Sequence, residues 1–209
     1  MNIKITHSWL LEYLETDATP LEIQKYLSLC GPSVERIEEV NGETVYDIEI
    51  TSNRIDTASV LGIAREAAAI LPMFGKKAIL KKRLLKTPEV PSSSVPIEII
   101  DEKGICRRVL GIVMEVYEVS SAPDYIAKRV LLTGTRSINN LVDITNYVMT
   151  EIGHPTHVFD YDRIATHRLI LRHAKKGEEI ITLDEKKYTL DESDIVIDDG
   201  AGRVIDLPA

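Results

Sequence analysis

Cysteine is scarce in this sequence of 209 residues, which contains only Cys30 and Cys106. The two residues are far apart and have apolar neighbours, so neither a disulfide framework nor a Cys-x-x-Cys metal site is indicated. We expect both to be reduced structural thiols, because a free cysteine mostly behaves as a small buried hydrophobe.

Long apolar runs are also missing. No run approaches the roughly 18 to 20 residues that a membrane-spanning helix requires. Residues 1–10 lack the basic and then apolar order of a secretory signal peptide. We therefore expect a cytoplasmic protein. A glycine-rich phosphate loop is absent as well, so no cofactor is expected to bind these residues.

An excess of positive charge is the third absence. The formal net charge is −8, which argues against a protein that coats nucleic acid non-specifically, since such binding depends on neutralised phosphates. Any nucleic-acid contact must be local. The basic stretch 75–86 carries six Lys or Arg residues and no acid. It is either a solvated linker face, which is the plainer interpretation, or a strip that contacts phosphates.

The first 74 residues carry clear local signals for helices and one hairpin. Thr19-Pro20-Leu21-Glu22 is a capping box with proline at the first helical position, and Gly31-Pro32 ends the helix. Asn41-Gly42 is a strong two-residue hairpin signal. We expect helices at 8–14, at 20–30 and from Asp56 or Thr57 to Leu71, and strands at 34–40 and 43–51.

Residues 75–96 change composition abruptly, from basic to rich in Pro and Ser, and predict a linker between two domains. The expected domains are 1–74 and 97–209. Because helices and strands are segregated, the fold class is α+β. The second domain is expected to contain helices at 123–134 and 141–152 and strands at 97–101, 106–119, 168–173, 179–183, 187–190 and 195–198, with a turn at 184–186.

The segment 136–160 concentrates polar groups around a predicted helix, which packing alone does not explain. Three interpretations stay open from the residues themselves. A metal site could use His154, His157 and Asp160, although Pro155 interrupts a continuous face. His157 could instead be hydrogen-bonded in a core, with Asn146 capping a turn. A pocket for a small molecule or a tRNA end could use a larger set of side chains. That set is Arg136, Thr145, Asn146 and His157.

Residues 137–160 (SINNLVDITNYVMTEIGHPTHVFD) resemble the signature of the phenylalanyl-tRNA synthetase β subunit, in which V-D-x-T-N-Y-V is followed by G-Q-P-x-H-A-F-D. Such a long gapped match is highly specific. Residues 49–56 and 62–66 are similar to the I-T-P-N-R-x-D and G-x-A-R-E/D elements of the same family. Residues 8–10 and 195–200 add support, so the resemblance covers essentially the whole chain.

The resemblance implies a proofreading site that hydrolyses tyrosine wrongly attached to phenylalanine tRNA. By position, His157 would help to hold the substrate and the attacking water, and Thr145 and Asn146 would shape the pocket. Arg136 and Pro155 would lie near the acceptor end of the tRNA. The family's partners are the tRNA and a synthetase α subunit, in a heterotetramer of two α and two β chains. ATP and Mg²⁺ serve the whole enzyme.

The sequence departs from the family pattern at several positions. His154 replaces a usual glutamine, Val158 an alanine, and Arg107 and Val109 flank Arg108 where Pro-Arg-Tyr is common. An oligonucleotide-binding domain that the family inserts near Asn41-Gly42 is absent. The chain also stops before the family's acidic residue that reads the tyrosine hydroxyl, so we expect a fragment with an incomplete pocket.

Two rival functions remain. The chain could be a non-catalytic module that docks the α subunit or tRNA, which an exposed apolar face on the helix ending at Leu71 would favour. It could also be a free-standing trans-editing protein, which a gene ending at Ala209 would favour.

Overall fold

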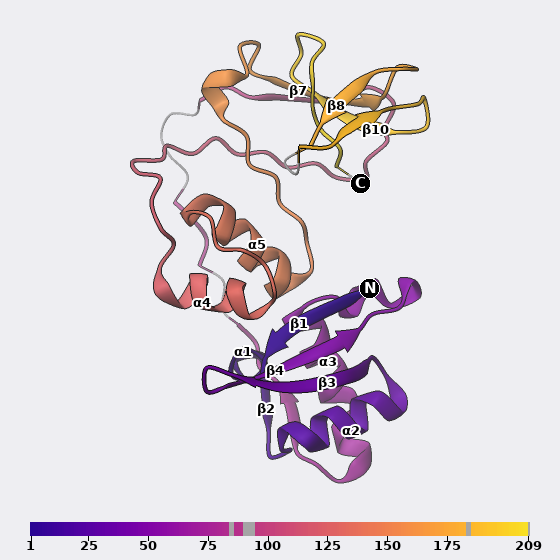
Figure 1. The fold of residues 1–209 in the computed structure, drawn as a ribbon, viewed down its shortest axis with the longest axis vertical. Helices are drawn as coiled ribbons and strands as arrows, with labels where there is room; N and C mark the ends of the chain where they lie inside the picture. Colours follow the sequence, from indigo (N-terminus) through magenta and orange to yellow (C-terminus); the bar gives the residue numbers. More distant parts are fainter. Residues whose placement is uncertain (84–85, 90–94, 183–184, 209) are drawn as a thin grey trace. The chain divides into compact units, whose positions relative to one another are not determined.

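The structure is a computed structural model that describes residues 1–83, 86–89, 95–182 and 185–208 (Figure 1). Chain contacts divide it into two compact units. Unit 1 comprises residues 1–87 and 117–158, and unit 2 comprises residues 88–116 and 159–209. Residues 90–94 of the expected linker, the strand end at Leu183 and Asp184 of the expected turn lie outside the described residues. No helix in the described part of the chain is long and apolar enough to cross a bilayer.

Unit 1 contains an antiparallel sheet in the order β1-β4-β3 (Figure 1). Its strands are β1 (Asn2–Thr6), β3 (Ser33–Val40) and β4 (Glu43–Glu49). Asn41 and Gly42 both have positive φ, 53° and 75°, as a tight two-residue hairpin turn requires. The predicted hairpin is therefore confirmed. β1 was not predicted, because its strand character depends on pairing with β4, which is distant in sequence.

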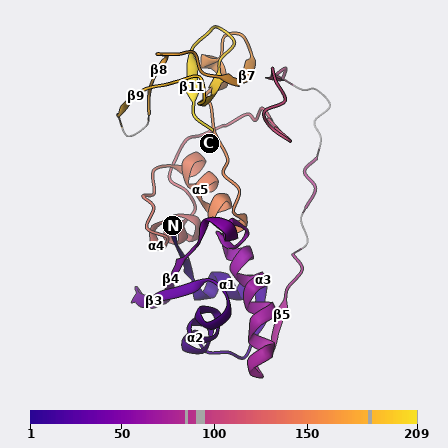
Figure 2. The same ribbon diagram turned by 90° about the vertical axis from the view of Figure 1, so that its right-hand side faces the viewer.

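The first two helices of unit 1 lie close to their predicted ranges, whereas the third begins later than predicted (Figure 2). α1 spans His7–Tyr13 and α2 spans Pro20–Cys30. The Thr19 and Glu22 side chains form the predicted capping box at the start of α2. α3 spans Val60–Ile70 and is followed by the 3-10 turn η2 (Leu71–Phe74).

The predicted start of α3 at Asp56 or Thr57 was wrong. Residues Ser52–Thr57 form the 3-10 helix η1 instead. Ser59 is the N-cap, and its side chain accepts a hydrogen bond of 2.9 Å from the Gly62 amide. A serine cap satisfies an amide that has no partner inside the helix, so the helix begins at the residue after Ser59.

The basic stretch is tied into unit 1. Its β5 (Ala78–Leu80) pairs with β2 (Leu14–Thr16) in a two-stranded sheet. Lys76 pairs with Glu22 at 2.5 Å, and further ion pairs join Lys77 to Glu15 and Arg83 to Glu151. Cations paired internally are less available to phosphates, so these contacts favour a structural role for the stretch over a phosphate-binding strip.

Helices α4 (Asp124–Leu132) and α5 (Asn140–Ile152) also belong to unit 1. Ile126, Val130 and Tyr147 are buried in the same core as Trp9 of α1. The contact-defined units thus divide the chain differently from the expected domains 1–74 and 97–209. The physical reason is that the apolar faces of α4 and α5 are buried against the N-terminal elements.

Unit 2 contains a four-stranded sheet in the order β11-β10-β7-β6, in which β6 is parallel to β7. Strands β8 and β9, which come between β7 and β10 in the sequence, form a separate antiparallel hairpin. Ala174, Ile180, Leu190 and Val196 form the small core of unit 2. The α+β class is confirmed, since the helices are combined with sheets in which every pairing except that of β6 with β7 is antiparallel among the described strands. The elements are β6 (Glu98–Asp101), η3 (Tyr161–Arg163), β7 (Arg168–His173), β8 (Glu179–Ile181), β9 (Lys187–Thr189), β10 (Ile195–Asp198) and β11 (Val204–Asp206).

The predicted strand at 106–119 was wrong, since no strand is formed there. The side chains of Leu110, Ile112 and Tyr117 are 84%, 78% and 91% exposed. A strand needs a neighbour with which to exchange backbone hydrogen bonds, and no described strand pairs with this segment. Both cysteines are free, as expected, but Cys30 is exposed at the end of α2 and not buried.

Candidate functional site

Helix α5 is the frame of the candidate site. It begins where the Asn139 side chain accepts a hydrogen bond of 3.0 Å from the Val142 amide. It ends at Gly153, whose φ of 77° is left-handed and therefore suits glycine. Both ends coincide closely with the predicted ones. The signals that define this helix thus also fix where its flanking loops begin.

The loop that precedes α5 is held by Asp143, whose side chain is fully buried. Its Oδ2 atom accepts a hydrogen bond of 2.5 Å from the Ser137 hydroxyl, and its Oδ1 atom accepts one of 2.8 Å from the Ile138 amide. Arg136, which lies next to Ser137, is exposed. The sequence motif contains Asp143, but its role as an anchor of this loop was missed, because the pattern shows only that a polar residue stands on an otherwise apolar face.

Thr145 and Asn146 lie near the middle of α5 and are half-buried. The Thr145 hydroxyl donates a hydrogen bond of 2.8 Å to the Val142 carbonyl. Its proton is therefore used inside the helix, and its lone pairs can accept a hydrogen bond from a ligand. Thr150 makes a similar bond of 2.9 Å to the Asn146 carbonyl.

Pro155 and His157 lie on the loop after Gly153, and both are exposed. An exposed loop imidazole can meet a ligand, whereas a core histidine cannot. The interpretation of His157 as a buried structural histidine is therefore not supported.

The predicted site residues are not gathered at one point. α5 has 13 residues and is thus about 20 Å long at 1.5 Å per residue. Arg136 precedes its start, and His157 follows its end, so these two residues belong to opposite ends of the helix. Thr145 and Asn146 lie between them along its length.

The metal interpretation gains no support. Within the described ranges, no group of three or more His, Cys, Asp or Glu side chains could hold a metal ion. Asp160, one of the three residues considered, instead caps the short helix η3 by accepting a hydrogen bond of 3.2 Å from the Asp162 amide.

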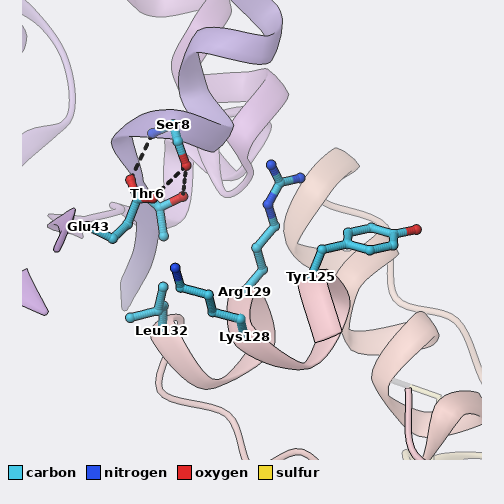
Figure 3. A pocket seen from close by; sticks show the side chains of 7 residues that line it. All are labelled: Thr6, Ser8, Glu43, Tyr125, Lys128, Arg129 and Leu132. Atoms are coloured by element: carbon cyan, nitrogen blue, oxygen red, sulfur yellow. Dashed lines mark hydrogen bonds between the residues drawn. The ribbon is translucent and has the colours of Figure 1, made fainter. Parts of the chain in front are cut away.

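A cavity of about 180 Å³ lies elsewhere in unit 1, and none of the predicted site residues lines it (Figure 3). Ser8 donates to Glu43 through its amide at 3.0 Å and its hydroxyl at 2.8 Å. Tyr125 points its hydroxyl away from this cluster (Figure 3). Ser8 therefore holds the Glu43 carboxylate in place at the wall of the cavity. Its lining residues are Thr6, Ser8, Glu43, Tyr125, Lys128, Arg129 and Leu132.

Arg129 of α4 is a second residue that the sequence did not single out. Its guanidinium lies 5.0 Å from the centre of the Trp9 ring and donates a hydrogen bond of 2.7 Å to the Tyr147 hydroxyl. It also forms an ion pair with Glu12. Burial, assisted by the carboxylate of Glu151, raises the pKa of Tyr147. Arg129 therefore joins α4, α5 and α1 through one side chain.

The two other family-like motifs meet at the start of α3. Arg54 forms ion pairs with Asp56 at 2.9 Å and with Glu66 at 2.5 Å. A Cβ atom on Gly62 would lie 2.4 Å from the Asp56 carbonyl oxygen, so only glycine fits there. These residues serve the local fold, since their charges are satisfied by one another.

Comparison with known proteins matches residues 105–209 to the B3/4 domain family. Phenylalanine–tRNA ligase β subunits of Thermotoga maritima and Aquifex aeolicus are 40% and 44% identical over 164 and 162 residues, each match covering 76% of this chain and 19% of the relative. The chain thus spans about a fifth of the length of these relatives. A solved N-terminal fragment of the Pyrococcus horikoshii phenylalanyl-tRNA synthetase β subunit is 17% identical, with a TM-score of 0.44, covering 100% of this chain and 61% of the fragment.

Proposed function

This chain belongs to the B3/4 domain family, and from that premise we propose that it contributes to proofreading within a phenylalanine–tRNA ligase β subunit. The reaction is hydrolysis of tyrosine wrongly attached to phenylalanine tRNA. The family resemblance inferred from residues 137–160 is confirmed by the matched relatives. Because the chain spans about a fifth of their length, the activity, the substrate and the partners all belong to the proposal.

The proposal rests mainly on the structure of residues 137–160. A helix capped at both ends presents two polar side chains, Thr145 and Asn146, and is followed directly by an exposed loop with His157. Phenylalanine and tyrosine differ by one hydroxyl, and a second site that examines the product is the usual solution where the first pocket discriminates too weakly.

The proposed roles follow from the chemistry of each group. His157 orients the attacking water or the ester, which suffices because an aminoacyl ester is intrinsically labile. Thr145 accepts a hydrogen bond through its free lone pairs, and Asn146 offers both a donor and an acceptor. Arg136 and Pro155 contact the tRNA end. The distance along α5 assigns Arg136 to a phosphate, away from the ester, because a guanidinium binds phosphate with two parallel hydrogen bonds.

The remaining parts of the proposal concern the whole ligase. ATP and Mg²⁺ would serve amino-acid activation on other residues, and this chain would need no cofactor. Its partners would be phenylalanine tRNA and the α subunit, in an assembly of two α and two β chains in the cytoplasm.

The test is deacylation of tyrosyl-tRNA and phenylalanyl-tRNA, both on phenylalanine tRNA, by the full-length protein that carries this chain. We expect tyrosine to be removed and phenylalanine to be spared. His157→Ala should lower the rate at least about tenfold, since loss of a positioned water or of acid–base assistance has such effects. Thr145→Ala should lower the rate or relax the choice between the two amino acids.

Two control variants match these changes. Thr150→Ala removes the same kind of hydroxyl-to-carbonyl bond from the same helix, and His154→Ala removes another exposed imidazole from the same loop. Both should retain most of the activity. A protein that clears neither substrate but still binds tRNA or the α subunit would replace the proposal with the non-catalytic module.

The non-catalytic module would have been favoured by an exposed apolar face on α3, and α3 has no such face among its buried residues. Val60, Ile63, Ala64, Ala67 and Ile70 of α3 are buried in the core of unit 1. The apolar face of this helix is therefore occupied by the protein itself. For the trans-editing alternative, no structural observation adds support.

A further inference from the structure

The motifs at 49–56 and 62–66 have no part in the proposed chemistry, yet the structure joins them. The Arg54 guanidinium donates to Asp56 at 3.0 and 2.9 Å and to Glu66 at 2.5 Å. Asp56 lies in η1, and Glu66 lies in α3. One side chain therefore fixes the 3-10 helix to the helix that follows it.

The turn between these two elements is packed without spare room. A Cβ atom on Gly62 would lie 2.4 Å from the Asp56 carbonyl oxygen and 2.8 Å from the Thr57 Cα atom. Backbone therefore lies directly against backbone at this point. Ser59 is 3% exposed and accepts a hydrogen bond of 2.9 Å from the Gly62 amide, which closes the turn onto the first turn of α3.

The end of α5 contacts this same turn. A Cβ atom on Gly153 would lie 3.2 Å from the Ser59 Cβ atom, 3.3 Å from its Oγ atom and 3.4 Å from the Ala58 carbonyl oxygen. Gly153 also has a φ of 77°. Two independent reasons, a left-handed backbone and a close neighbour, thus favour glycine where α5 ends.

We propose that the Ala58–Ser59 turn positions the His157 loop. The contact of this turn with Gly153 fixes the point at which the chain leaves α5, and Pro155 restricts the backbone between Gly153 and His157. Ser59 and Gly153 are positioning residues, which act through His157 and do not touch the substrate. The motifs at 49–56 and 62–66 fix the conformation of the Ala58–Ser59 turn. The inference rests on the proposed role of His157 in proofreading.

The first experiment compares two glycine substitutions. Gly153→Ala introduces both the backbone strain and the contact with Ser59. Gly177→Ala is the matched control, because Gly177 has a φ of 79° but nothing within 4 Å of an added Cβ atom. It introduces the strain alone. A third variant, Gly153→Asn, keeps the contact with less strain, since asparagine tolerates the left-handed conformation. This variant replaces Gly153→Ala in the comparison if Gly153→Ala folds poorly.

The first readout is the imidazole signals of His157 in NMR spectra of this chain, assigned with His157→Ala. The chain has five histidines, so the spectrum contains few such signals. The second readout is the deacylation kinetics of the full-length protein. We expect both Gly153 variants to shift the His157 signals and to lower kcat at least about fivefold with KM within twofold, since a misplaced group affects the chemical step more than binding. Gly177→Ala should change neither readout.

A rescue variant separates positioning from stability. Ser59→Gly removes the Cβ and Oγ atoms that Gly153→Ala would meet, and glycine is itself an acceptable N-cap. The double variant should regain the His157 signals and most of kcat. Unchanged His157 signals in the folded Gly153 variants, or shifted signals that Ser59→Gly does not restore, would overturn the inference. Because the NMR readout needs no activity, a protein without deacylase activity would refute the proposed function alone.

Discussion

Replacing Asp143 with alanine is the perturbation that best tests how the start of the candidate site is held. The Asp143 carboxylate is fully buried and accepts hydrogen bonds from the Ser137 hydroxyl and the Ile138 amide, at 2.5 and 2.8 Å. Alanine removes both bonds and leaves the loop before α5 without its anchor. Arg136, next to Ser137, loses its fixed position as a result.

The size of the effect follows from these two bonds. A hydrogen bond to a charged group contributes about 1.5 to 3 kcal/mol, so the pair contributes at most about 6 kcal/mol. Ser137 and Ile138 are exposed, which lets water take up part of their bonding once the carboxylate is gone. Removing a buried charge also relieves its desolvation cost. We therefore expect a loss of about 2 to 4 kcal/mol in the free energy of unfolding of unit 1.

Tryptophan fluorescence is a selective assay for this loss. Trp9 is the only tryptophan in the sequence, and it is fully buried in the core of unit 1. Its emission during urea unfolding therefore reports on unit 1. The midpoint should fall while the slope m stays unchanged, because a change in midpoint alone reports a change in stability.

Asp124→Asn is the control for charge. Asp124 is an exposed acid in the first turn of α4, where removal of its charge should cost less than about 1 kcal/mol. If Asp143→Ala costs no more than this control, or if the Ile138 amide exchanges with solvent equally fast in both variants, then the carboxylate does not anchor the loop and our reasoning about Asp143 is refuted.

Two further predictions concern other parts of the fold. Gly62→Ala should destabilise unit 1 by about 1 to 3 kcal/mol in the same fluorescence assay, because overpacking against the Asp56 carbonyl outweighs the gain of up to about 1 kcal/mol usual for alanine in a helix; a stabilised variant would contradict the contact. Hydrogen bonds from Arg172 lower the pKa of Glu178 to about 2. This stabilisation, up to about 3 kcal/mol, is present above pH of about 4.5 and should be lost as pH falls toward 2. Glu178→Gln should remove that dependence in acid unfolding followed by the NMR signals of unit 2, and an unchanged acid midpoint would exclude the pair as its cause.

Local signals were reliable where a short stretch decides the structure. The Thr19 capping box and the Asn41-Gly42 turn appear as predicted, since each satisfies its own backbone groups within four residues. The α3 start failed for a related reason. Several residues near it can cap a helix, and the choice of Ser59 depends on the close approach of Gly62 to the preceding turn.

Predictions that depend on distant partners were weaker. The apolar segment 106–119 has the composition of a strand, but composition does not supply the neighbour that a strand pairs with. Helices α4 and α5 were predicted closely, whereas their packing against Trp9 was not. The candidate site shows the same limit. Its helix and loop could be predicted from residues 137–160, but the buried state of Asp143 and the contact of Gly153 with Ser59 depend on tertiary packing.

The ion pairs of the basic stretch affect the salt dependence of the RNA binding that the proposed function requires. Binding to a polyanion gains free energy when condensed counterions are released, and each cation that replaces them steepens the fall of affinity with added salt. Lys76, Lys77 and Arg83 already have carboxylate partners in unit 1. They would release few counterions, so the slope of log affinity against log salt would be shallower than the six basic residues of the stretch suggest.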